Sequence, residues 1–302
     1  MEQQLSTIGK AFEYCLNIKY EEDTYFDNEC AIGNRFSFVF IEEGCGVMNR
    51  DGISFAYMAP TMLCISEKEH LVIPYSETQR IRVVYIHPDA IHFGLNFDLM
   101  NQPPLDLPAT MYQDINLFRF FTMRTNEWRG ILELGPMTAK KVGQCLDMIK
   151  LFTYEQEDPF WPCRTRSYIL EILFLQDRLE MKNTTMPTYV DGENVNEIEP
   201  ILKYLFINYS EKITIADLTK QFQLNRTTLA QLFQDALGES VITYLNKLRI
   251  QIASGMLRDT MLPVNDIMER VGFHDGGHFF RTYKKYTGLS PSEYREQYNW
   301  MI

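Results

Sequence analysis

Two similar stretches near the C-terminus constrain the fold of this chain more than any other feature. The first, "ITIADLTKQFQLNRTTLAQLFQDALG", begins at Ile213, and the second, "PVNDIMERVGFHDGGHFFRTYKKYTGLSP", begins at Pro263. Each combines a short helical pattern, a turn, a polar residue suited to cap a helix (Asn225 or Asp275) and a second helical pattern. This order predicts two helix-turn-helix units, a motif that places its second helix in the major groove of DNA.

The segment between the two stretches predicts one continuous helix over 240–257. Its apolar residues recur at steps of three or four, which puts them on a single helical face: Val241, Leu245, Leu248, Ile252 and Met256. Roughly 18 residues at ~1.5 Å each span about 27 Å. Units at the two ends could therefore lie near the ~34–36 Å that separates successive major grooves.

The turns inside the two units differ in one residue. Gly272 stands where a tight turn needs a positive φ, which glycine adopts at little cost, whereas Gln223 stands at that place in the first unit. The first turn is therefore either strained or of different geometry. In the second unit we expect the aromatic side chains of Phe279, Phe280 and Tyr283 to lie in the core.

The first two thirds of the chain predict strands followed by helices. Residues ~20–100 form short β-rich runs broken by turn signals at the spacing typical of a sandwich or barrel, and Arg80 to Pro88 is one strand closed by a proline. Helical periodicity covers 137–152 and 164–181, and the second of these helices carries an extra apolar face that either covers the barrel or meets a second subunit. The polar, non-periodic segment that follows reads as a linker. We expect an α+β chain with domains at 1–181, 182–196 and 197–302.

Charge is distributed unevenly. Residues 1–196 contain 17 basic and 28 acidic side chains, and residues 197–302 contain 12 of each, which gives −11 and zero. The acidic part would repel phosphates, so any contact with DNA should lie in the C-terminal third. A neutral DNA-binding domain predicts modest affinity for a single site and a need for dimerisation. The chain has no apolar run of ~18 residues, no signal-peptide pattern and six scattered cysteines, so we expect a cytoplasmic protein with reduced thiols and no membrane association.

The C-terminal residues resemble the AraC/XylS family of bacterial transcription factors over about 100 residues. The second half carries the more specific signature, V-G-F-x-D-x-x-x-F-x-R-x-Y-K-K-x-x-G-x-S-P-x-x-Y-R, from Val271 to Arg295. The first half contributes the matching positions Leu218, Leu229, Phe233, Gly238, Tyr244, Arg249 and Ala253. The resemblance implies a cupin-like N-terminal barrel with two helices for sensing and dimerisation, followed by an all-α domain of two helix-turn-helix units joined by a linker helix.

The resemblance also implies which residues contact DNA. The first recognition helix would present Arg226, Thr227, Ala230 and Gln231, and the second would present Gly276, Gly277, His278 and Arg281. Arg281 is the best candidate for a bidentate guanine contact, although alone it could be a surface salt bridge with Asp275 or Glu269. Lys284 and Lys285 would bind phosphate, as would Arg226 on the helix flank; without this context the two lysines would be a solvated face.

The recognition helices are not equal. Gly276 and Gly277 have no side chains for base readout, so the second helix would rely partly on DNA shape, and Ala230 could meet only a thymine methyl. We therefore expect the first unit to supply much of the base discrimination. The second would contribute Arg281 and phosphate anchoring.

The N-terminal domain offers candidates for an effector site. Phe36, Phe38, Phe40 and Tyr57 could line a cavity, or could equally be plain core, and Arg80 and Arg82 could meet an acidic effector. The scattered His70, His87 and His92 lack the H-x-H pattern of metal-dependent cupins, so neither a metal nor another cofactor is expected. Catalytic and nucleotide-binding motifs are also missing from the sequence, which argues against an enzyme.

Together these patterns predict a sequence-specific transcriptional regulator, and an activator rather than a repressor. Its expected partners are double-stranded DNA, a second copy of the chain bound through residues 137–181, RNA polymerase, and a small-molecule effector. Two alternatives stay open: a cupin-type enzyme fused to a DNA-binding tail, and a regulator controlled by a partner protein instead of a small molecule.

Overall fold

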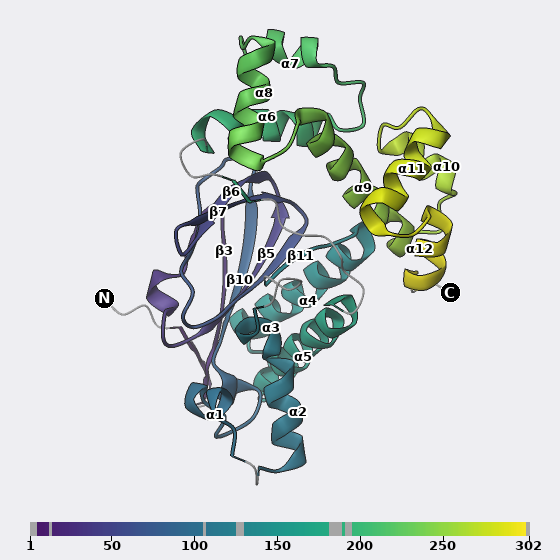
Figure 1. Cartoon of the computed structure of the whole chain (residues 1–302). Coiled ribbons are helices and arrows are strands. Elements are labelled where there is room, and N and C mark those ends of the chain that lie inside the picture. Colours follow the sequence, from purple (N-terminus) through teal and green to yellow (C-terminus); the bar gives the residue numbers. More distant parts are fainter. Residues whose placement is uncertain are drawn as a thin grey trace. The chain divides into compact units, whose positions relative to one another are not determined.

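The computed structural model describes residues 5–11, 14–104, 107–124, 130–180, 189–190 and 195–299 (Figure 1). The chain divides into two compact units, each assembled from several segments. The N-terminal unit comprises 1–44, 61–132 and 140–183, and the C-terminal unit comprises 45–60, 133–139 and 184–302. Two segments from the first half of the sequence thus belong with the C-terminal helices. Within the described ranges, no helix is both long and apolar enough to cross a membrane.

An antiparallel sheet forms the centre of the N-terminal unit. Its strand order is β11-β8-β5-β10-β3, with bounds Ile131–Glu133, Thr61–Ile65, Phe36–Glu43, Arg80–Ile86 and Ile18–Asp23. Strand β10 ends just before Pro88, as the sequence predicts. The sheet is open, because β11 and β3 are its edges, so these five strands do not close into the barrel that the sequence analysis expects. The short strands of this unit pair as β1 (Thr7–Ile8) with β2 (Cys15–Leu16) and β4 (Phe26–Asp27) with β9 (Leu71–Ile73).

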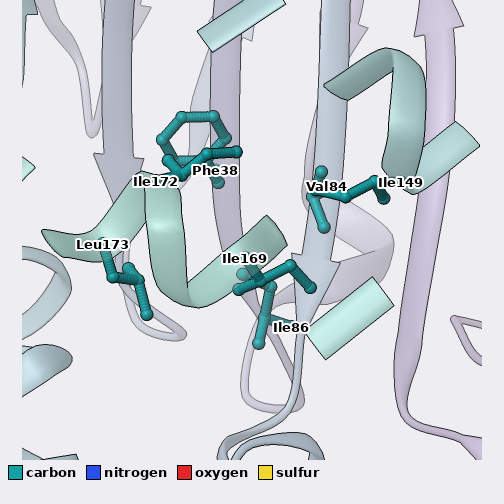
Figure 2. A pocket seen from close by; sticks show the side chains of 7 residues that line it. All are labelled: Phe38, Val84, Ile86, Ile149, Ile169, Ile172 and Leu173. Atoms are coloured by element: carbon teal, nitrogen blue, oxygen red, sulfur yellow. The ribbon is translucent and has the colours of Figure 1, made fainter. Parts of the chain in front are cut away.

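Two long helices cover one face of this sheet. They are α4 (Pro136–Tyr154) and α5 (Trp161–Glu180), at the positions that the periodicity predicts. Their buried isoleucines and leucine pack on the face of β5 and β10 that carries Phe38, Val84 and Ile86 (Figure 2). The apolar surface of α5 therefore covers the sheet, while Phe174 on the same helix is half exposed. The connections contain η1 (Glu29–Ala31), η2 (Pro88–Ala90), α1 (Phe97–Asn101), α2 (Ala109–Leu117) and α3 (Arg119–Thr122).

The C-terminal unit contains seven described helices and a β-hairpin. The hairpin joins β6 (Cys45–Arg50) to β7 (Ile53–Met58), and β12 (Tyr189–Val190) pairs with β7. The first helix, α6, begins at Val195, inside the segment 182–196 that reads as a linker; residues 182–188 and 191–194 lie outside the described residues. The helices are α6 (Val195–Ile207), α7 (Ile215–Gln221), α8 (Arg226–Leu237), α9 (Val241–Asp259), α10 (Val264–Arg270), α11 (Gly276–Thr287) and α12 (Pro291–Tyr298).

Helix α9 joins two separate hydrophobic cores (Figure 1). The serine hydroxyl of Ser240 caps it by accepting a hydrogen bond from the Thr243 amide. Its N-terminal half packs into the first core, with α6 and α8, through the predicted face of Val241, Leu245 and Leu248. Its C-terminal half packs into the second core, with α10, α11 and α12, through a different set: Ile250, Ala253 and Leu257. The long helix thus contributes buried residues to both helix-turn-helix units, and Ile252 contacts both cores.

Candidate DNA-binding surface

Side-chain caps fix where the helices of the first helix-turn-helix unit begin. Thr214 and Asp217 form a reciprocal capping box at the start of α7. Asn225 begins α8, because its side-chain oxygen accepts a hydrogen bond of 2.8 Å from the Thr228 amide. Gly238 ends α8 in the left-handed conformation, which glycine adopts without steric cost. These local signals alone define the span of the recognition helix.

The turns of the two units have the same backbone conformation with different residues. Gly272 has a φ of +83°, and Gln223 at the equivalent place has a φ of +55°. Of the two possibilities that the sequence leaves open, the structure therefore has the strained one. A side chain other than glycine in this region costs of order 1 kcal/mol or more.

Gly272 is fixed by close contacts as well as by conformation. A Cβ atom at this position would lie 2.7 Å from the Tyr209 carbonyl oxygen and 2.9 Å from Nη2 of Arg249. The buried guanidinium of Arg249 donates hydrogen bonds to the carbonyls of Tyr209 (2.8 Å) and Glu211 (2.7 Å), and it lies 5.6 Å from the ring centroid of Phe273. Its burial lowers the pKa of Arg249 below the usual arginine value. Arg249 on α9 thus ties the segment after α6 to the turn of the second unit.

Helix α8 presents a polar face to solvent. Its buried side holds Leu229, Leu232 and Phe233, and the predicted contact residues all lie on its exposed side: Arg226, Thr227, Ala230 and Gln231. The side-chain amide of Gln231 donates a 2.7 Å hydrogen bond to Asp235, one turn later. Arg226 lies in the first turn, where the helix dipole disfavours a positive charge, so helix stability does not explain it.

Helix α11 presents glycines and cations. His278, Arg281, Lys284 and Lys285 are exposed, as is Gly277, and Gly276 is half-buried. A Cβ atom on Gly277 would lie 3.1 Å from Nη1 of Arg281 and 3.4 Å from Asp275, so the guanidinium lies close over this glycine. Among the described residues Arg281 forms no ion pair, so the alternative of a salt bridge with Asp275 or Glu269 is not realised.

One aromatic residue of α11 corrects the expectation from sequence. Phe279 and Tyr283 are fully buried in the second core, as predicted, but Phe280 is 39% exposed. The physical reason is helical geometry: Phe279 and Tyr283 are four residues apart and share a face, whereas Phe280 is rotated about 100° from its neighbour. Phe280 therefore joins the solvent-facing surface of the second recognition helix.

The comparisons with known proteins concern mainly this region. Residues 218–297 match the family model described as a helix-turn-helix domain. The Escherichia coli K12 protein "Uncharacterized HTH-type transcriptional regulator YdiP" is 36% identical over 33% of this chain and 33% of its own length. The Escherichia coli "HTH-type transcriptional activator RhaS" is 22% identical over 85% of this chain and 84% of its own length. A crystal structure from Chromobacterium violaceum, described as a transcriptional regulator with an AraC-type DNA-binding domain, is 27% identical, covers 35% of this chain and 91% of that one, and has a TM-score of 0.32.

The helix-turn-helix units of this chain form a domain of the AraC type. The chain covers only about a third of the length of YdiP, so the match rests on this domain. The sequence correctly identifies the caps Asn225 and Asp275 and most of the buried residues of both helix-turn-helix units. Phe280 is the residue that is predicted wrongly. Its place directly after the buried Phe279 indicates that it faces another side of the helix.

The predicted effector residues lie on strands of both units. Phe36, Phe38 and Phe40 are buried on β5, and the pairing of Phe38 with Val84 and Phe40 with Arg82 places them on the face covered by α4 and α5. Tyr57 lies on β7, in the other unit. The cavity beside Phe38 measures about 10 Å³, no more than one water molecule needs (Figure 2).

The two predicted cations are already surrounded by acids. The Arg82 side chain is 4% exposed; its Nη1 lies 2.8 Å from Asp147 and its Nε lies 3.0 Å from Glu42. Arg80 lies 3.3 Å from the same Glu42 carboxylate. These ion pairs connect β10 to β5 and α4. In this arrangement Arg82 has a structural partner on the sheet face and does not need an acidic ligand to balance its charge.

The three candidate histidines lie apart from one another. Each has its own aspartate: His70 lies 2.8 Å from Asp27, His87 lies 2.7 Å from Asp89, and His92 lies 2.6 Å from Asp114. Within the part of the chain that the structure describes, no three histidine, cysteine, aspartate or glutamate side chains gather as a metal site would.

Proposed function

We propose that this protein regulates transcription by binding DNA sequence-specifically, with α8 and α11 in successive major grooves. One observation carries the proposal: two capped recognition helices with exposed faces are joined by a single helix that packs into the core of each unit. The 19 residues of α9 span about 28 Å, which is compatible with the ~34–36 Å repeat of B-DNA.

The DNA contacts divide between the two helices in this proposal. Thr227 and Gln231 on α8 read base edges, with Ala230 available to a thymine methyl, and Arg226 binds a flanking phosphate. On α11, Arg281 reads guanine, His278 faces the groove, and Lys284 and Lys285 bind phosphate. Gly276 and Gly277 let the helix backbone approach the DNA closely.

The N-terminal unit is proposed to control this binding as a cupin-like sensor that also makes the protein a homodimer. Support for dimerisation comes from exposed apolar side chains on the two long helices: Leu151, Tyr154 and Phe174. The name of the RhaS relative supports activation, and with it a contact to RNA polymerase. A small-molecule effector remains part of the proposal, with Phe36, Phe38, Phe40, Tyr57, Arg80 and Arg82 as its predicted residues.

The test is selection of binding sites by the full-length chain. Duplexes with a randomised central region are incubated with the protein, the bound fraction is separated by gel shift, and the enriched sequences are determined over several rounds. We expect one enriched motif with two half-sites about one helical turn apart. A variant with both Gln231→Ala and Arg281→Ala serves as the control and should enrich no motif. Enrichment of no motif by the wild-type chain would contradict the proposed function.

A further inference from the structure

The exposed ring of Phe280 lies among the residues proposed to face DNA. It is on α11 next to Arg281, four residues before Lys284, and it is 39% exposed. The other exposed side chains of this helix are polar or charged: His278, Arg281, Lys284 and Lys285. Phe280 is not one of the buried residues of the second core, whose buried aromatic side chains are Phe273, Phe279, Tyr283 and Tyr294.

The ring is held in place from below. Its centroid lies 5.7 Å from that of Phe279, with the two planes at 70°, an edge-to-face arrangement that is favourable for aromatic pairs. Phe279 itself is fully buried and contacts Phe273 and Tyr283. Phe280 is therefore supported by the core and presents its outer part to solvent in a restricted orientation.

The turn that precedes Phe280 on its helical face contains two glycines, and the Arg281 guanidinium lies over the second of them. Residues three and four positions earlier are Gly277 and Gly276, and a helical side chain leans back over that turn. A Cβ atom on Gly276 would meet only Met268, at 3.9 Å, and neither glycine has a positive φ. Packing and backbone conformation thus do not require glycine at Gly276, although glycine weakens a helix by up to ~1 kcal/mol.

We propose that Phe280 is a specificity-determining residue that contacts the 5-methyl group of thymine in the major groove. The inference rests on the proposed function, since it needs α11 in the groove. Among the base edges in the major groove, that of thymine presents an apolar group, the 5-methyl. A phenyl ring cannot form the hydrogen bonds through which the other base edges are read. Gly276 leaves room for the ring to reach the base, beside the Arg281 guanidinium that lies over Gly277. With Arg281 beside it, the second unit reads a thymine next to a guanine, and not DNA shape alone.

The experiment uses the full-length chain and the duplex that it selects from the random library. Each thymine in the half-site of the second unit is replaced in turn by 2′-deoxyuridine, which removes only the 5-methyl group. For the wild-type chain we expect about a fourfold loss of affinity at one or two positions, the change that burial of one methyl-sized group corresponds to. Phe280→Ser should show equal affinity for the two bases there, and Phe280→Leu should keep part of the difference.

Two controls separate the possible failures. Phe160→Ser removes an exposed aromatic ring from the N-terminal unit and should keep the full effect of the methyl group. Phe280→Ser should still unfold cooperatively, with a midpoint only about 2–4 °C below that of the wild type, because it loses one edge-to-face contact with Phe279 and some buried area. A wild-type chain that selects a motif but is indifferent to every thymine methyl overturns the inference alone, as does a difference that persists in Phe280→Ser. A chain that selects no motif overturns the proposed function together with it.

Discussion

The two helix-turn-helix units have the same backbone plan but are stabilised and equipped differently. In the first, the turn contains a strained Gln223, α7 has a capping box, and the recognition helix exposes Arg226 beside uncharged polar groups. In the second, the turn is a glycine enclosed by carbonyls and Arg249, α10 follows Pro263 without a side-chain cap, and the recognition helix carries cations and an exposed ring. Two units of one fold thus present different surfaces, as the proposed division between base discrimination and phosphate anchoring requires.

The largest expected effect concerns the enclosed turn. Gly272→Ala would place a methyl group 2.7–2.9 Å from two carbonyl oxygens and the Arg249 guanidinium, in addition to the strain at positive φ. We expect the free energy of unfolding to fall by about 3 kcal/mol or more. Gly238→Ala is the matched control in the first unit, because its φ is +69° and nothing lies within 4 Å of the added Cβ. It should cost about 1 kcal/mol; equal losses in urea or thermal unfolding would contradict the account.

A second prediction compares the arginines of the two recognition helices. Arg281→Ala should weaken binding to the selected duplex by about 1–3 kcal/mol and relax the preference for guanine at one position. Arg226→Ala should weaken binding to all sequences alike, because a phosphate contact carries no sequence information. Gel shifts with single-base variants of the site measure both. Unchanged affinity and base preference for Arg281→Ala at high salt would remove it from base readout.

The strained turn of the first unit gives a smaller effect of opposite sign. Gln223→Gly should raise the free energy of unfolding by about 0.5–1 kcal/mol, because relief of strain exceeds the entropy that glycine adds to the unfolded chain. DNA affinity should not change. Thermal unfolding of Gln223→Gly checks this prediction. Gly272→Gln is the matched variant in the second unit and should be strongly destabilised. A destabilised Gln223→Gly would mean that contacts of its own favour the glutamine.

The smallest expected effect is a pH dependence that distinguishes α7 from α10. Hydrogen bonds from the Thr214 hydroxyl and amide lower the pKa of Asp217 below its usual value, so folding favours the ionised carboxylate. The stabilisation is present above the unfolded pKa and is lost as the pH falls through the lower folded value. Amide exchange should therefore accelerate in α7, but not in the uncapped α10, as the pH falls below about 4. Equal acceleration in α7 and α10 of the wild type would contradict the assignment. The same acceleration of α7 in the Asp217→Asn variant would contradict it too.

Local signals in the sequence predict most of the C-terminal unit. Asn225 and Asp275 cap helices as expected, and the periodicity of α9 predicts its approximate length and its first buried face. The second face of α9 could not be predicted in the same way, because the helix serves two cores whose positions depend on residues far away in the sequence. The prediction that Phe280 lies in the core with Phe279 and Tyr283 is wrong, because a helix turns about 100° per residue and the neighbour of Phe279 faces another direction.

The N-terminal unit shows where periodicity fails. In β5, residues on both faces are buried, so the alternation that would identify the inner face is lost. The sequence alone does not show that Phe38 and Phe40 lie under α4 and α5, because these helices come much later in the chain. The ion pairs of Arg82 with Glu42 and Asp147 have the same non-local origin.

The division of roles between the two units is tested most directly by the salt dependence of binding in matched double variants. Affinity for the selected duplex and for a scrambled duplex is measured between 50 and 200 mM salt, about the range over which phosphate contacts dominate. Thr227→Ala with Gln231→Ala should lower the ratio of the two affinities and leave the salt slope unchanged. Lys284→Ala with Lys285→Ala should lower both affinities alike and reduce the slope by about 1–2. The opposite pattern, with the lysine pair changing the ratio and the α8 pair changing the slope, would contradict the account.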